Sequence, residues 1–166
     1  MTTVDHFLRN DTNLVPSDAV VGLILLEDGR YLMQRRSQLP GIFYPGHWGL
    51  FGGGVEPGET AEAALARELR EELAIEGFDA TYFTEFTFDF GCCGHSRVWR
   101  RYYRIELGAG LVRQIVLGEG SEMRAFAATD ILLQPRVVPY DAFAIWMDAS
   151  QRLARSPGLS TAIDRE

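Results

Sequence analysis

Three glutamates within five residues are the part of this chain with the clearest chemistry. Glu68, Glu71 and Glu72 lie in the stretch RELREEL, which follows a glycine-rich turn and has the composition of a helix. Because an α-helix turns once per 3.6 residues, Glu68 and Glu72 are expected on one face, with Glu71 beside them. Like charges four residues apart oppose helix formation, and a bound cation relieves this. Carboxylate oxygens suit Mg2+, with Mn2+ as a substitute, so the stretch predicts a divalent metal site.

The simplest alternative is a solvated helix face, which is what most charged runs are. The preceding residues argue against it. Residues 52–54 are three glycines, Pro57 and Gly58 form a predicted turn, and Thr60 is a suitable N-cap. A loop and helix of this kind hold one backbone conformation, which a solvated helix does not need.

The segment from Gly53 to Ile75 resembles the sequence box of the Nudix hydrolase family. That box reads Gly, five residues, Glu, seven residues, then Arg-Glu-U-x-Glu-Glu-x-Gly-U, where U is aliphatic. The chain matches it at Gly53, Glu59, Arg67, Glu68, Leu69, Glu71, Glu72 and Ile75. The departure is Ala74, which replaces the second glycine of the box. Because that position lies at the helix end, we expect a changed helix exit and little effect on the chemistry.

The resemblance implies an α/β protein, with a Nudix-type α/β/α sandwich whose mixed β-sheet lies between helices. It also implies a divalent-metal-dependent hydrolase that cleaves a phosphoanhydride bond. The substrate would be a nucleoside diphosphate linked to a group X, such as a nucleoside triphosphate or a nucleotide sugar. Glu68, Glu71 and Glu72 are the expected metal ligands, and the resemblance adds the carbonyl of Gly53.

Two other functions stay open on the same fold. One is a non-catalytic regulator that binds nucleotides or nucleotide sugars, although such proteins usually lose the acidic helix residues that this chain keeps. The other is an isomerase, whose cysteine segment precedes the acidic helix, whereas Cys92 and Cys93 follow it. Adjacent cysteines rarely pair, so reduced thiols are expected. With His95 they form only a weak zinc signal.

Two catalytic roles remain, one expected from position on the helix and one implied by the resemblance. Arg67 lies about 100° from Glu68 around the helix axis, so we expect it to orient Glu59 or a neighbouring carboxylate. The resemblance leaves the general base open between Glu68 and an acid of a late loop. There we assign Glu122, with Glu119 as its competitor, and either can instead be a solvated loop residue.

Substrate contacts are expected near the glycine-rich turn, including Gly54 itself. Arg35 and Arg36 end a predicted strand, and adjacent strand residues point to opposite faces, so only one of them can reach a phosphate in the pocket. Trp48 is a candidate for stacking on a base, although aromatic residues more often belong to the core. The same applies to three further aromatic residues, Phe43, Tyr44 and Phe88.

Composition and charge limit the partners. The 166 residues have the hydrophobic content of an ordinary globular domain. The net charge of −7 argues against binding a nucleic acid duplex through its phosphates. It does not exclude a small-molecule nucleotide that arrives with its own cation. We see no membrane span and no signal peptide, so we expect a cytoplasmic protein, with a homodimer left open.

The chain is expected to comprise an arm (1–17), a Nudix domain (18–155) and a tail (156–166). Strands are predicted at 19–26, 31–35, 48–51, 80–90, 97–107, 111–117 and 123–128, and helices at 60–73 and 140–154. The non-acidic face of the first helix carries Ala61, Leu65, Leu69 and Leu73, which can pack on a sheet. This order is compatible with a mixed sheet covered by helices on both faces.

Overall fold

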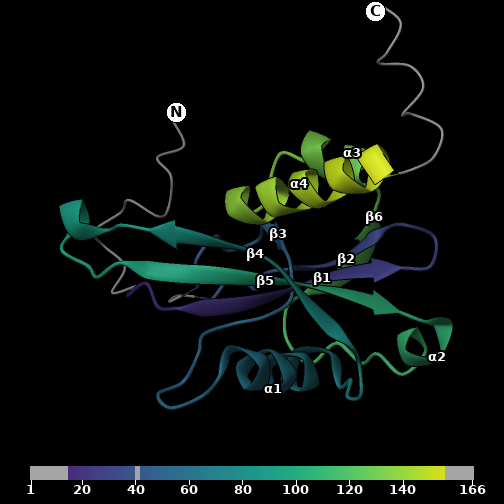
Figure 1. Cartoon of the computed structure of the whole chain (residues 1–166), viewed down its shortest axis with the longest axis horizontal. Helices are drawn as coiled ribbons and strands as arrows, with labels where there is room; N and C mark the ends of the chain where they lie inside the picture. Colours follow the sequence, from purple (N-terminus) through teal and green to yellow (C-terminus); the bar gives the residue numbers. More distant parts are fainter. Residues whose placement is uncertain (1–14, 40–41, 156–166) are drawn as a thin grey trace, which may run out of the picture.

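A computed structural model describes residues 15–39 and 42–155 (Figure 1). A six-stranded mixed sheet lies between α1 (Ala61–Leu73) on one face and α3 (Ala128–Leu133) and α4 (Pro139–Arg155) on the other. The predicted α/β/α sandwich is therefore confirmed. Most of the predicted arm and the whole predicted tail lie outside the described residues. None of the helices in the described part combines the length and apolar character needed to span a membrane.

The sheet has the strand order β3-β2-β1-β5-β4, and β6 also pairs with β2. The strands are β1 (Ala19–Leu26), β2 (Tyr31–Arg35), β3 (Trp48–Gly49), β4 (Ala80–Phe88), β5 (Val98–Leu107) and β6 (Glu122–Phe126). β1 runs parallel to β5, and the other strand pairs are antiparallel. After β3 the chain continues along β1, through bridges from Phe51 to Gly22 and from Gly54 to Ala19. The glycine-rich turn is thus anchored to the central strand.

The core has two parts because the sheet is covered on both faces. Successive residues of β1 point to opposite faces. Val20 packs in the cluster that contains the leucines of α1, and Val21 packs in the cluster that contains Ile145 of α4. Burial of each leucine side chain contributes roughly 1.5–3 kcal/mol. The predicted apolar face of α1 is therefore what holds the acidic helix against the sheet.

Both ends of α1 follow from local chemistry. Thr60 caps the start, where its side chain accepts a hydrogen bond from the Ala63 N–H at 3.2 Å. The helix ends at Leu73, and Ala74 takes the left-handed conformation with φ 55°. Glycine usually occupies such a position because it has no Cβ. We expected Ala74 to change how the chain leaves the helix, but its backbone takes the conformation that a glycine would take there. Ala74 adopts the glycine-like conformation and carries its strain.

The predicted strand at 111–117 is wrong. The region forms a short helix, α2 (Ala109–Val112), followed by irregular chain. Its apolar residues recur at 111, 112 and 115, which is a helical spacing, and they pack against the α1 side of the core. After these residues, the backbone forms hydrogen bonds to the end of α1 instead of to a strand.

The other elements lie close to their predicted positions. The strand predicted at 48–51 is shorter, because only β3 and isolated bridges form there. The predicted hairpin is β4 and β5, with a short 3-10 helix, η2 (Gly91–Cys93), between them. The predicted last helix is α4. The sequence did not predict α3, which begins at Ala128, the last residue of the predicted strand.

Candidate active site

Two neighbouring hollows form the candidate active site. The first, the acidic hollow, has a volume of about 360 Å3 and is lined by Gln34, Arg36, Ser37, Ile42, residues 52–54, Glu68, Glu71, Glu72, Glu119 and Gly120. The second, the aromatic hollow, has a volume of about 710 Å3 and lies between the start of α4, the β4–β5 hairpin and the loop before β3. Arg36 and residues 52–54 line both hollows. The two hollows therefore lie next to each other.

Glu72 is the most buried of the three helix glutamates, with 5% of its surface exposed. Its carboxylate accepts hydrogen bonds from Gln34 Nε2 at 2.5 Å and from the Gly52 N–H at 2.6 Å. Burial raises the pKa of Glu72 to about 7; the two hydrogen bonds oppose this rise, whereas the charges of Glu68 and Glu119 add to it. The ionised carboxylate is therefore poorly compensated by the protein alone.

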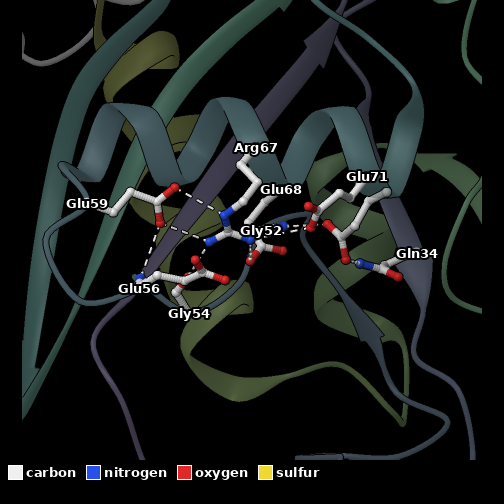
Figure 2. A network of polar contacts seen from close by, with 9 residues as sticks. Gln34, Gly52, Gly54, Glu56, Glu59, Arg67, Glu68 and Glu71 are labelled. Carbon is white, nitrogen blue, oxygen red and sulfur yellow. Dashed lines mark hydrogen bonds and ion pairs between the residues drawn. The ribbon is translucent and has the colours of Figure 1, made fainter.

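Arg67 links the carboxylates along the loop and the helix, as Figure 2 shows. It donates to Glu59 through Nε at 3.1 Å and Nη2 at 3.0 Å, and to Glu68 through Nη1 at 2.7 Å. It also reaches Glu71 at 3.3 Å and the carbonyl of Gly54 at 2.9 Å. These partners, Glu59 first, raise the pKa of Arg67. Arg67 thus orients Glu59 and its neighbours, as its place on the helix led us to expect.

Glu68 lies directly against the glycine-rich turn. A Cβ added at Gly53 would lie 2.4 Å from the Glu68 carboxylate, so no other residue fits at position 53 without displacing it. Burial raises the pKa of Glu68, and the contact with Arg67 only partly offsets this. The carbonyl of Gly53 accepts a hydrogen bond from the Val20 N–H at 2.9 Å. A carbonyl has two lone pairs, so one stays available for a ligand.

The donor set fits a hard divalent cation by its chemistry. In the described part of the chain, no three acidic, histidine or cysteine side chains are already gathered as a metal ion would gather them. The reason is visible in the contacts, since Arg67 holds Glu68 and Glu71 while Glu72 turns to Gln34. All three carboxylates nevertheless line one hollow. Burial raises the pKa of two of them, Glu68 and Glu72, and a cation such as Mg2+ would compensate the charge of these two carboxylates.

The loop after α2 brings a fourth carboxylate to the acidic hollow. The N–H groups of Val116 and Gly118 donate to the carbonyls of Leu73 and Glu72, at 3.0 and 2.8 Å. They satisfy helix-end carbonyls that would otherwise lack a partner. A Cβ at Gly118 would lie 2.2 Å from a backbone oxygen of α1, so this docking needs glycine. The next residue, Glu119, lines the acidic hollow.

Glu122, the acid that we assigned in this loop, is not among the residues that line either hollow. It begins β6, where its carboxylate contacts Arg124 at 2.6 Å and Arg35 at 3.5 Å. The competing residue Glu119 is therefore the loop acid that the structure brings to the helix glutamates.

The paired arginines diverge, as strand alternation requires. Arg35 is exposed, pairs with Glu122 and lies outside both hollows. Arg36 lines both, and its Nε donates to the carbonyl of Phe43 at 2.7 Å. Trp48 lines neither hollow. It is 5% exposed and packs edge to face on Phe126 in the core, which is the ordinary place for an aromatic residue.

Most of the aromatic hollow was missed by the sequence reasoning. Phe43, Tyr44 and Phe88, which were candidates for stacking on a base, line it, and Gly54 lies at its border. Further lining residues that were not predicted are Phe86, Phe90, Trp99, Arg100, Tyr140 and Phe143. Alternating aromatic residues at 86 and 88 carry a signal for one strand face. No sequence pattern indicates that α4 starts beside the strand face that carries these two residues. Gln34, which holds Glu72, was missed as well.

Comparisons with known proteins agree with this geometry. A family model described as the NUDIX domain matches residues 15–147. The nucleoside triphosphatase NudI of Escherichia coli O1:K1 / APEC is 48% identical over 69 residues, which cover 42% of this chain and 48% of that protein. The chain thus spans about half the length of the curated relatives it matches.

Solved structures share the fold. The MutT protein from Methanosarcina mazei Go1 superimposes with a TM-score of 0.68 at 22% identity, covering 87% of this chain and 99% of that one. The MutT NUDIX hydrolase from Burkholderia pseudomallei gives 0.63 at 26% identity, covering 78% and 95%. Because the family model covers most of the chain and the box lies within it, this chain belongs to the Nudix family.

Proposed function

We propose that this chain is a divalent-metal-dependent pyrophosphohydrolase that cleaves a phosphoanhydride bond in a nucleoside diphosphate linked to a group X. The observation that carries the proposal is that an acidic hollow lies next to an aromatic one, with Arg36 and residues 52–54 lining both. A diphosphate that binds together with a divalent cation suits the first hollow, and a nucleoside suits the second. The name of the NudI relative, nucleoside triphosphatase, supports nucleoside triphosphates as the first substrates to test.

Glu68, Glu71 and Glu72 would hold Mg2+, or Mn2+ in its place, with the carbonyl of Gly53 as a further ligand. When bound, the ion neutralises charge on the diphosphate oxygens and makes water a better nucleophile. Glu68 would give up its contact with Arg67 for the ion. Arg67 would stay in place, because Glu59 and the carbonyl of residue 54 also hold it.

Arg36 is proposed to hold the substrate phosphate at the border of the two hollows. Its Nε is bound to a backbone carbonyl, which fixes the side chain. Its Nη groups make no hydrogen bond or ion pair to any described residue, so they remain available to phosphate oxygens. A guanidinium offers paired donors that match a phosphate.

Glu119 is proposed to accept the proton of the attacking water. It lines the acidic hollow and makes no hydrogen bond or ion pair to any described residue, whereas Glu122 is paired with two arginines. Glu68 is the alternative base. Loss of a general base costs typically about a hundredfold or more in rate. Glu119→Gln should therefore lower kcat by about a hundredfold, whereas Glu122→Gln should leave it nearly unchanged.

The test is a hydrolysis screen over nucleoside triphosphates, nucleotide sugars and dinucleoside polyphosphates. The purified protein should be inactive in EDTA and recover with Mg2+ or Mn2+, releasing a nucleoside monophosphate. Activity should rise at mildly alkaline pH, since the attacking water loses its proton more easily there. Tight nucleotide binding by calorimetry without cleavage of any compound would instead establish the regulator alternative.

A further inference from the structure

Arg100 places a guanidinium in the wall of the aromatic hollow. It lies on β5, where its backbone is opposite Ala19 of β1 and Phe86 of β4. The residue is partly buried and lines the aromatic hollow but not the acidic one. Its Cζ lies 4.4 Å from the ring centroid of Tyr140 at the start of α4. This cation–π contact holds the guanidinium against the ring.

The guanidinium of Arg100 makes no hydrogen bond or ion pair with any residue that the structure describes. The nearby Asp141 is 2% exposed, and its oxygens accept from the Leu50 N–H and the Tyr102 hydroxyl, both at 3.0 Å. Burial lowers the pKa of Arg100, but Tyr140 and Asp141 outweigh it and the pKa is raised. Arg100 therefore stays charged. In the described residues no buried side-chain nitrogen lacks a hydrogen-bond partner, so the donors of Arg100 are exposed at the hollow and can bind an acceptor on a ligand.

The rest of the aromatic hollow is poor in hydrogen-bond acceptors. Its described lining contains no Asp, Glu, Asn, Gln or His, and its side-chain hydroxyls come from Ser17, Tyr44 and Tyr140. Most of the other walls are aromatic rings or glycine backbone. Flat heteroaromatic rings stack well in such a space. A base in this hollow would therefore meet a stacking surface and, away from Arg36 at the border with the acidic hollow, a strong cluster of donors at Arg100.

We infer that Arg100 selects nucleotides whose base carries a carbonyl oxygen at the edge facing β5. The inference rests on the proposed function and names its substrate class. Guanine offers O6 and N7, which an arginine can bind with two hydrogen bonds, and thymine and uracil offer O4. Adenine and cytosine present an amino group at the corresponding place. Their amino groups would face the donors of Arg100, and the bound base would bury these donors without giving them a partner.

The role of Arg100 is distinct from phosphate binding. Arg36 lies where the two hollows meet, next to the acidic residues, whereas Arg100 lines the aromatic hollow alone. A phosphate-binding arginine would affect every nucleotide alike, because all of them carry the same phosphates. A base-selecting arginine affects only the bases whose edge it binds. Selectivity among bases therefore separates the two roles.

The experiment compares kcat/KM for dGTP, dTTP, dUTP, dATP and dCTP. The wild type should prefer the first three by on the order of tenfold or more, which is the scale for one good arginine–base contact. Arg100→Gln should remove this preference by lowering kcat/KM for the carbonyl bases, with dATP and dCTP nearly unchanged. The dGTP and dTTP arms tell a purine site from a pyrimidine site. Arg101→Gln is the matched control, since Arg101 pairs with Glu85 and lines neither hollow.

Calorimetric binding of non-hydrolysable analogues of the same nucleotides, with Mg2+, keeps the two proposals apart. If nothing is hydrolysed, the proposed function fails, yet a carbonyl-base preference in Kd that Arg100→Gln removes would still support the role of Arg100. A wild type without base preference overturns the inference, and this outcome does not depend on any variant folding. An equal loss for all nucleotides in Arg100→Gln, or no binding of any of them, overturns it too.

Discussion

Replacing Glu72 by glutamine is expected to stabilise the metal-free protein and to abolish its activity. Glu72 is 5% exposed, and burial raises its pKa to about 7 from the ordinary 4.5. Each pKa unit corresponds to about 1.4 kcal/mol. At pH 8, where the carboxylate is ionised in the folded and unfolded chain, its charge thus costs the fold up to roughly 3 kcal/mol. Glutamine has nearly the same shape without the charge.

The hydrogen bonds of Glu72 can survive this change. The Gly52 N–H can donate to the remaining oxygen of residue 72, and the Gln34 amide can turn its own oxygen toward the new NH2 group. The gain in stability of Glu72→Gln over the wild type should increase with pH. A carboxyl group with a raised pKa in the folded state contributes stability below its unfolded pKa, and this contribution is lost as pH rises through about 7. The advantage of Glu72→Gln should therefore be largest at pH 8 and disappear near pH 4.

Urea unfolding in EDTA at the two pH values measures the stability difference. Turnover with saturating Mg2+ measures the effect on activity, where we expect the rate of Glu72→Gln to fall by two or more orders of magnitude. Glu76→Gln, whose side chain is 73% exposed just beyond the helix, serves as the control and should change neither quantity. A variant at position 72 that is less stable than wild type at pH 8 in EDTA would refute the reasoning. Near wild-type turnover would do the same.

Two further predictions concern stability. Ala74→Gly should raise the free energy of unfolding by roughly 0.5–1 kcal/mol. The left-handed conformation costs alanine about 1–2 kcal/mol, and the greater entropy of the unfolded chain with glycine offsets part of the gain. A lower melting temperature of the variant would contradict this. Burial alone raises the pKa of Asp148, but hydrogen bonds from Tyr31 and two arginines bring the pKa below its ordinary 3.8. The ionised Asp148 should therefore contribute stability above pH 3.8, and this contribution should be lost as the pH falls below that value. Urea unfolding at pH 6 and pH 3 measures the loss, which should be absent in Asp148→Asn.

The acidic helix could be predicted from sequence because its determinants are local. The spacing of Glu68 and Glu72 places them on one face, and Thr60 marks the start of the helix, so each feature depends only on near neighbours. Glu59 was one of the expected partners of Arg67, since it directly precedes Thr60, the N-cap of the helix. These parts of the site agree with the structure.

The remaining parts depend on tertiary contacts that no local pattern reports. Glu119 lies in the acidic hollow because its loop donates backbone hydrogen bonds to the end of α1, and sequence alone did not favour it over Glu122. Trp48 packs in the core because α3 and α4 cover that face of the sheet. Arg100 lines the aromatic hollow, and its partner Tyr140 comes from the start of α4, far along the chain.

Binding of Mn2+ to the nucleotide-free protein tests whether the acidic hollow is a metal site. Electron paramagnetic resonance follows the loss of the free Mn2+ signal as the protein is added. Wild type and Glu76→Gln should bind the ion, Mg2+ should compete for it, and Glu72→Gln should bind at least about tenfold more weakly. Equal binding by wild type and Glu72→Gln, or no binding by wild type at millimolar Mn2+, would contradict the assignment of the helix glutamates as its ligands.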